Sequence, residues 1–432
     1  MHAKSNPTPM PRPKAADYLI ASKKCELQNL AYFLQMGRLV LCISNLIHAL
    51  QRERGASNIF LGSDGKRFAN QRLEQIETAD RERSNFEQAL NDIHQELTEN
   101  PGSSRLLNLI ACALHGLSGL DDLRHRIQAL DMTSQTAIAA YSETIQMLLA
   151  VVFEAADNAV DPAIAGILVA MYNLMHGKEL AGQERAVGSA GFSRGRFDTA
   201  LSQRMAHLIE AQERCFEVFA NFADPDSKAL WLQATASRRE GEVERLRQLG
   251  CSIGRYKDLD TSLADQWFEL MSDRMDELKT VEDSLEAHFR KRCIEKFTDA
   301  KNSLTHQESL IESLDQHDRA PEPMLVLCGT QPNDPHADTV QSDGVSQRFG
   351  RSIFDLVQQQ AQRLQQMSDE LCAAKEALED RKTQEKAVLL LMNHRQISND
   401  EAHKLLRKLA MNQGKKLPDV ARSIVAMADV LA

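Results

Sequence analysis

Two short segments of this chain place a charged pair of side chains directly before small ones. The first, "QRERGASNIFL", covers residues 51–61, and the second, "GQERAVGSAGF", covers residues 182–192. In both segments a Glu-Arg pair stands inside an otherwise apolar stretch. A guanidinium presents a planar fork of N–H donors that suits a flat anion. Since a buried charge needs a partner, the repeated motif indicates either an anion site or a buried ion pair.

Both interpretations use the same residues. Arg54 and Arg185 occupy equivalent positions, and the small residues after them would let two helices approach closely, so that both guanidinium groups could contact one anion. Arg52 is a further candidate ligand, although residues two apart on a helix face different directions. In the alternative, Glu53 and Glu184 orient or neutralise neighbouring arginines, and the motif is an ion-pair lock between two bundles with no ligand.

The sequence contains no motif that indicates catalysis. No nucleophile with a nearby base, no cluster of metal ligands and no Gly-rich phosphate loop accompanies the motifs. The eight cysteines are scattered singly without a CxxC pair, which is typical of thiols in a reducing compartment. We therefore expect no enzyme activity, no cofactor and no metal site.

The sequence also predicts a cytoplasmic protein with no membrane contact. The first residues are polar and rich in proline and lack the apolar core of a signal peptide. The longest apolar zone, residues 147–175, is interrupted by Glu154, Asp157 and the Asp161-Pro162 pair, so we interpret it as two buried helices.

The elements that must position these motifs are helices. Aromatic residues make up 5% of the 432 residues, and there are 20 Gly and 12 Pro, a composition that favours helices. Only "MLVLC", at residues 324–328, alternates as a short strand would. We predict an all-α fold with two four-helix bundles side by side, then a coiled-coil helix and a three-helix C-terminal domain. Apolar residues recur with the helical period over about 30–50, 66–97, 103–129, 133–157, 162–188, 196–221, 227–249 and 262–314.

Composition sets the expected domain boundaries. Residues 1–18 are a disordered tail, 19–315 a helical domain, 316–350 a linker rich in Pro, Asp, Ser and Gly, and 351–432 a coiled coil with the C-terminal domain.

A heptad repeat predicts how two chains associate. Val357, Leu364, Leu371 and Leu378 recur every seven residues, with Met367 at a companion position. A coiled coil over residues 353–378 would make a homodimer. The alternative is an amphipathic helix that packs on its own domain.

The C-terminal segment differs in charge from the rest. From Arg381 onward, ten Lys or Arg side chains stand against five Asp or Glu, giving net +5 in a chain of net −10, so the remainder carries about −15. A small basic domain on an acidic body predicts that only this end meets a polyanion.

The same segment resembles the ANTAR domain, the RNA-binding effector of bacterial antiterminators. The resemblance rests on Arg381, "SNDEA" at residues 398–402 and "LLRKLAMNQGKKLPDVA" at residues 405–421, and covers about residues 370–430. Where the family usually has Ala-Lys-Gly, this chain has Ala-Val-Leu at 387–389. One commonly basic position is therefore neutral.

The resemblance implies an RNA-binding face. No aromatic residue follows Phe354, which leaves no platform on which bases would stack broadly. Phosphate contacts from Lys and Arg, base-edge contacts from Asn412 or Gln413 and stacking on His394 or His403 remain. The alternatives are a solvated charged face, or a helix-turn-helix that binds DNA. The candidate RNA-binding residues are Lys382, Lys386, Arg395, Lys404, Arg407, Lys408, Asn412, Lys415 and Lys416.

The N-terminal region resembles the NIT domain, a helical module that senses nitrate and nitrite. The resemblance rests on the two Glu-Arg segments and on "DQWFELMSDRMDELKTVE" at residues 265–282, and spans about residues 30–295. It also implies an arginine from a later helix, for which Arg238 and Arg239 are candidates.

The two resemblances together imply a nitrate-responsive transcription antiterminator of the NasR type. Such a protein binds nitrate or nitrite between its sensor helices and in response binds hairpins of a leader RNA to prevent termination. Two alternatives stay open, namely the same architecture sensing another small anion or a protein partner, and a DNA-binding regulator.

Overall fold

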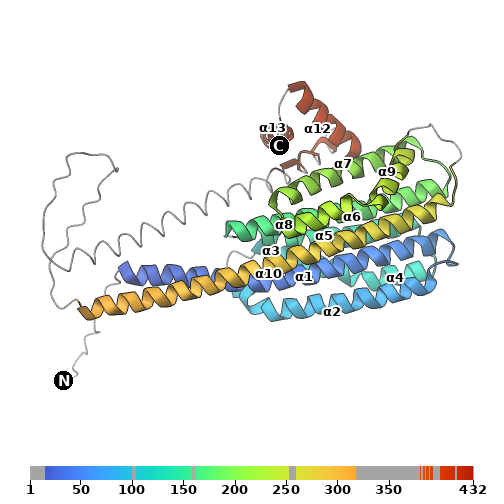
Figure 1. Cartoon of the computed structure of the whole chain (residues 1–432). Helices are drawn as coiled ribbons and strands as arrows, with labels where there is room; N and C mark the ends of the chain where they lie inside the picture. The colour runs from blue at the N-terminus through green and yellow to red at the C-terminus, as the bar shows by residue number, and fades with distance from the viewer. Residues whose placement is uncertain are drawn as a thin grey trace, which may run out of the picture. The chain divides into compact units, whose positions relative to one another are not determined.

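The computed structural model describes residues 15–99, 104–157, 159, 161–252, 259–317, 380, 383–384, 386–388, 390–392, 399–413 and 416–431. Every regular element in these residues is a helix, which confirms the all-α class (Figure 1). The alternating segment at 324–328, the heptad seam at 353–378 and the expected linker from 318 onward lie outside the described residues.

The helices follow the predicted periodicity with some differences at their ends. The first begins at Ala15, so residues 15–18, which we expected in the disordered tail, are helical. The expected helices 103–129 and 227–249 are each divided in two, near Gly119 and Ala236. The bounds are α1 Ala15–Gly62, α2 Ala69–Glu99, α3 Ser104–Ser118, α4 Leu120–Gln128, α5 Ser134–Asp157, α6 Pro162–Ser193, α7 Thr199–Phe222, α8 Pro225–Thr235, α9 Arg238–Cys251, α10 Leu263–His317, α12 Asn399–Gln413 and α13 Leu417–Leu431.

Asp-Pro pairs start two of these helices. The carboxylate of Asp161 accepts hydrogen bonds from the backbone N–H groups of Ala163 and Ile164, and Pro162 fills the first position of α6. Asp224 caps α8 in the same way before Pro225. Each cap satisfies N–H groups that have no partner inside the helix, which explains why the apolar zone 147–175 divides into two helices.

The chain forms two compact units. One consists of residues 1–32 and 293–369, and the other of residues 33–292 and 370–432. Both α1 and α10 therefore contribute to each unit. The Glu-Arg motifs and their surroundings lie entirely in the second unit.

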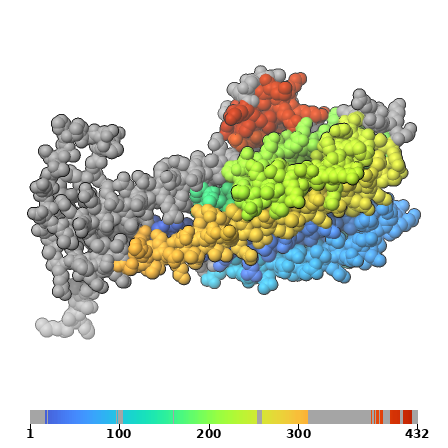
Figure 2. All heavy atoms as spheres, in the orientation of Figure 1, coloured from blue at the N-terminus to red at the C-terminus, as the bar shows by residue number. Residues whose placement is uncertain are grey.

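Buried side chains link the helices of the second unit in two groups. Glu53 of α1 binds Arg124 of α4 and Tyr141 of α5, and Arg124 also binds Asp80 of α2. Glu184 of α6 is linked in turn to α7 and α9. Figure 1 shows α10 running between the α1 and α2 side and the α7 to α9 side, and Figure 2 shows a packed surface over this face. The grouping is compatible with two adjoining four-helix bundles.

The two groups meet where α1 crosses α6. Gln51 of α1 donates to Glu179 of α6, whereas Gly55, one turn later, lies beside Arg185. Residues later in α1 contact residues later in α6, so these two segments run parallel. Arg185 is 134 residues from its hydrogen-bond partner Gln51, yet the crossing places the two Glu-Arg motifs side by side.

Three segments of the described chain are long and apolar enough to cross a membrane, namely Ile20–Gly62, Ser104–Gln128 and Ser134–Asp157. Length and composition alone identify them. Their apolar side chains also supply the bundle core, where Leu39, Ile43 and Leu148 are fully buried. Packing between helices therefore accounts for much of their apolar character.

The described C-terminal residues form a small core of their own. Val388, which replaces a commonly basic residue of the ANTAR pattern, is 2% exposed. This side chain packs inside the domain and does not reach a surface that could meet RNA. The core consists of Ala387, Val388, Ala402, Leu406, Ala410, Val420 and Ala421.

Candidate anion-binding site

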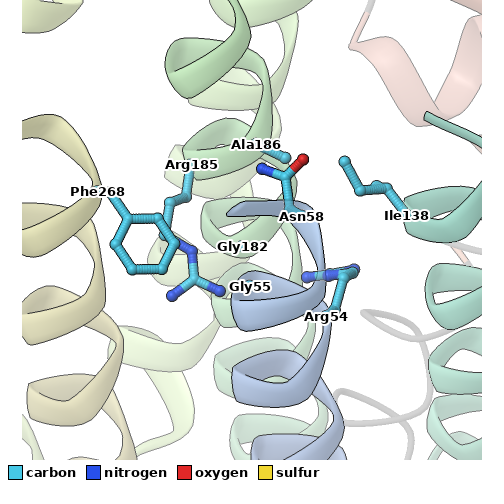
Figure 3. A pocket seen from close by; sticks show the side chains of 8 residues that line it. All are labelled: Arg54, Gly55, Asn58, Ile138, Gly182, Arg185, Ala186 and Phe268. Carbon is cyan, nitrogen blue, oxygen red and sulfur yellow. The ribbon is translucent and has the colours of Figure 1, made fainter. Parts of the chain in front are cut away.

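A small pocket lies at the crossing of α1 and α6 (Figure 3). About 200 Å³ of space, part of it open solvent, lies among its lining residues. Helices α1, α5, α6 and α10 all contribute to its wall, so a bound ion would contact both groups of helices. The lining residues are Arg54, Gly55, Asn58, Ile138, Gly182, Arg185, Ala186 and Phe268.

Arg54 already has a carboxylate partner. Its Nη1 lies 2.6 Å from Oε1 of Glu179, and its Nη2 lies 3.1 Å from Oε2. Both side chains are almost completely buried, and Arg54 also donates to Ser142 Oγ. Glu179 accepts further hydrogen bonds from Gln51 and Gln183. The charge of Arg54 is therefore balanced before any ligand enters.

Arg185 has no such partner among the residues that the structure describes. It donates to Ser272 Oγ at 2.8 Å and to the Gln51 carbonyl oxygen at 2.9 Å, and its Cζ lies 4.8 Å from the ring centroid of Phe268. Burial, and then the neighbouring Arg54, lower the pKa of Arg185 to about 9. The guanidinium stays protonated at neutral pH, so the site holds a buried positive charge that no carboxylate of the described residues contacts directly.

Two glycines make room for the guanidinium groups. A Cβ atom at Gly55 would lie 2.5 Å from Nη2 of Arg185, and one at Gly182 would lie 2.4 Å from Nη2 of Arg54. No real Cβ contact is that short, so any larger residue would displace the arginine. The small residues of the motif thus allow α1 and α6 to face each other through their arginines.

The glutamates of the two motifs point away from the pocket. Glu53 accepts two hydrogen bonds from Arg124, at 2.8 and 2.9 Å, and one from Tyr141. Glu184 accepts two from Arg247, both at 2.8 Å. The ion pairs of the two motif glutamates therefore each lie within one group of helices, whereas the buried Arg54–Glu179 pair crosses from α1 to α6.

Removing one of these carboxylates should destabilise the fold. Burial lowers the pKa of Arg247, but Glu184 raises it above its ordinary value overall. In Glu184→Gln the buried guanidinium would lose its countercharge, so we expect a loss of about 3–5 kcal/mol in the free energy of unfolding. Urea denaturation measures this. Glu244→Gln is the matched control because Glu244 is 55% exposed and 3.7 Å from Arg247, and it should cost less than about 1 kcal/mol.

The other arginines that we predicted as ligands lie outside the pocket. Arg52 is exposed and donates to Asp276 at 2.9 and 3.1 Å. Arg238 is exposed at the start of α9, and Arg239 pairs with Glu277 at 2.8 Å. In the described structure the later helix contributes Phe268 to the wall instead of an arginine. Phe268 lies in the segment 265–282, directly after Trp267, and Asn58 lies in the first Glu-Arg segment, 51–61. Neither residue was predicted as a ligand.

The candidate RNA-binding residues are only partly described. Lys386, Lys404, Lys408 and Lys416 are exposed. Arg407 is half-buried and pairs with Glu210 of α7. Asn412 lies in α12, and Lys382, Arg395 and Lys415 fall outside the described residues.

Metal binding finds no support in the part of the chain that the structure describes. No group of three or more His, Cys, Asp or Glu side chains is placed there to hold a metal ion.

Comparisons with known proteins identify two domain families and two relatives of this chain. A family described as nitrate and nitrite sensing (NIT) matches residues 45–290, and the ANTAR domain family matches residues 372–425. A nitrate regulatory protein of Klebsiella oxytoca is 34% identical over 415 residues, which is 96% of each chain. The solved structure of the NasR transcription antiterminator is 31% identical, with a TM-score of 0.59, and the match covers 97% of this chain and 100% of that one.

Proposed function

This chain belongs to the family of nitrate-responsive transcription antitermination regulators that join a NIT sensor to an ANTAR domain, and we propose that its signal ligand, nitrate or nitrite, binds between Arg54 and Arg185. The observation that carries this assignment is the buried guanidinium of Arg185, which has no carboxylate partner among the described residues. A monoanion beside it would supply the missing countercharge.

The pocket has the charge for such an ion, and its two guanidinium groups have a planar form that suits it. Arg54, Arg185 and Glu179 together carry one net positive charge, which matches an anion of charge −1. In Figure 3 the guanidinium groups of Arg54, from α1, and Arg185, from α6, lie on either side of Gly55. Planar forks on two sides can donate to the oxygens of a flat anion at the same time.

The ligand would act on more than one helix. Arg185 belongs to α6, its guanidinium lies over the ring of Phe268 from α10, and it donates a hydrogen bond to the backbone of α1. A change in the charge around this guanidinium therefore changes its contacts with α1 and α10 as well as the position of α6. Of these helices, α10 leads toward the C-terminal part of the chain. We propose that this path couples nitrate to RNA binding by the ANTAR domain.

The remaining assignments follow from the same proposal. The chain acts as a regulator without enzyme activity or cofactor, and binds hairpins of a leader transcript through the exposed lysines of its ANTAR domain. It is a cytoplasmic homodimer, paired through residues 353–378, with its apolar helices packed in bundles and not in a membrane.

Titration calorimetry of the full chain tests the sensor assignment. Nitrate and nitrite should bind to a single class of sites, whereas chloride and sulfate at equal concentration should give much weaker binding. Chloride lacks the planar set of oxygens, and sulfate carries one charge too many for the site. Binding of all four anions with equal affinity would contradict the assignment.

A methyl group at Gly55 should weaken nitrate binding. Gly55→Ala would place a Cβ atom where Nη2 of Arg185 lies, 2.5 Å away, and the end of the arginine side chain must move. We expect at least a tenfold loss of nitrate affinity, about 1.4 kcal/mol. The free energy of unfolding should change by less than about 1 kcal/mol, because Ala favours a helix over Gly.

Gly62→Ala is the matched control. Gly62 ends the same helix, and a Cβ atom there would meet nothing within 4 Å. Calorimetry should find wild-type affinity in this variant. If Gly55→Ala also bound nitrate as the wild type does, the position of the ligand beside Arg185 would be wrong.

A further inference from the structure

Asn58 is a polar side chain in the pocket that neither arginine accounts for. It lies four residues after Arg54, and so on the same face of α1. It is half-buried and lines the same space as both guanidinium groups. A carboxamide carries one acceptor and two donors, so its orientation decides whether it repels or attracts an anion.

Ser134 sets that orientation. The hydroxyl of Ser134, the first residue of α5, donates a hydrogen bond to Oδ1 of Asn58. With its oxygen occupied in this way, the carboxamide turns its Nδ2 donors away from Ser134. Among the described residues, Nδ2 of Asn58 makes no hydrogen bond of its own.

Figure 3 shows where those donors point. In this view the carboxamide nitrogen of Asn58 lies on the side nearer Arg185, whereas its oxygen lies on the side away from Arg185. The acceptor is thus tied to α5, and the donors lie on the side of the carboxamide nearer Arg185, in a pocket that both arginines line. This is the arrangement that an acceptor-only ligand requires.

We propose that Asn58 is a third anion-binding residue of this site, donating from Nδ2 to a ligand oxygen, and that Ser134 is a positioning residue that holds the carboxamide in that orientation. The inference rests on the proposed nitrate site. It also accounts for the expected preference for a monoanion over a divalent anion. A neutral third donor adds a hydrogen bond while the pocket keeps a single net positive charge. A lysine or arginine at this position would instead suit a divalent anion.

Nitrate calorimetry on the full chain tests the proposal with three single variants. Asn58→Leu keeps the approximate volume and removes the donors, and should weaken nitrate binding about tenfold. Asn58→Asp adds a negative charge at the same volume, leaves the pocket neutral, and should weaken binding a hundredfold or more. Ser134→Ala frees the carboxamide and should weaken binding about threefold to fivefold. Thermal unfolding without nitrate checks that each variant folds.

A double variant separates positioning from a merely structural role. If Ser134 acts through Asn58, Asn58→Leu combined with Ser134→Ala should bind nitrate no more weakly than Asn58→Leu alone. Asn85→Asp is the control for an added carboxylate, because Asn85 is exposed on α2. This control should bind nitrate as the wild type does.

The outcomes distinguish this inference from the proposed function. Wild-type affinity in both Asn58 variants, with nitrate binding present in the wild type and lost in Arg185→Ala, would overturn the role of Asn58 and leave the nitrate site intact. Additive losses in the double variant would overturn the role of Ser134. A wild-type protein that binds no nitrate would overturn the nitrate site and this inference together.

Discussion

Arg185→Ala should abolish nitrate binding without unfolding the protein. The variant removes the one buried guanidinium of the pocket that has no carboxylate partner among the described residues, so the ligand would lose its principal countercharge. Leaving a buried charge without its partner costs roughly 2–5 kcal/mol. The affinity should therefore fall at least about 30-fold. Calorimetry measures the affinity, and thermal unfolding without nitrate should show a midpoint no lower than that of the wild type by more than a few degrees.

The form of the cation matters as well as its charge. Arg185→Lys should also lose most of its affinity, because an ammonium group cannot present a planar fork or stack on Phe268 in the same way. Arg52→Ala and Arg239→Ala are matched controls, since both side chains are exposed and pair with acidic residues of α10. Loss of binding in these controls, with unchanged binding in Arg185→Ala, would contradict the assignment of the pocket.

Arg54 is a less clean test than Arg185, although the two positions are equivalent in sequence. Arg54→Ala would leave Glu179, which is fully buried, without its ion-pair partner. Breaking a buried ion pair in this way costs about 3–5 kcal/mol of stability. Lost nitrate binding in Arg54→Ala would therefore mix the loss of a ligand contact with damage to the fold.

The second large effect concerns RNA. Nitrate should increase the affinity of the full chain for its RNA at least tenfold, and Arg185→Ala should remove this response. A ligand shifts an equilibrium only by its different affinities for the two states. The sequence carries net +5 from Arg381 onward and about −15 elsewhere, so docking of the basic domain on the acidic body would compete with RNA in the absence of nitrate.

A binding assay at one fixed ionic strength measures this response, because salt weakens RNA contacts and internal docking alike. Wild type, Arg185→Ala and residues 350–432 are compared with nitrate and with an equal concentration of chloride. The fragment should bind RNA equally well in both. Equal affinities across all samples would mean that the sensor does not control the ANTAR domain.

A duplex DNA of the same sequence completes this experiment. An ANTAR domain that acts on RNA should bind the hairpin and leave the duplex free, since the chain lacks an evident set of base-reading residues for a helix-turn-helix. Preference for the duplex would instead favour the DNA-binding alternative.

The sequence by itself determined the class of fold and the two arginines of the candidate site. Helical periodicity and Asp-Pro starts are local properties, so they located most helices without any tertiary information. The repeat of Glu-Arg before small residues identified Arg54 and Arg185 because both copies use the same chemistry at the same spacing. The replacement of a commonly basic residue by Val388 was likewise visible in the sequence.

Only the tertiary structure decided which side chains pair. Glu179 lies outside both Glu-Arg pairs and 125 residues from Arg54, and no local pattern connects them. The motif glutamates bind Arg124 and Arg247, which stand in unremarkable segments. The register at which α1 crosses α6, and the direction in which each helix presents its arginine, decide which buried charge has a countercharge. That register is set by packing over the whole bundle. Hence one of two equivalent arginines, Arg54, has a carboxylate partner, and the other, Arg185, has none among the described residues.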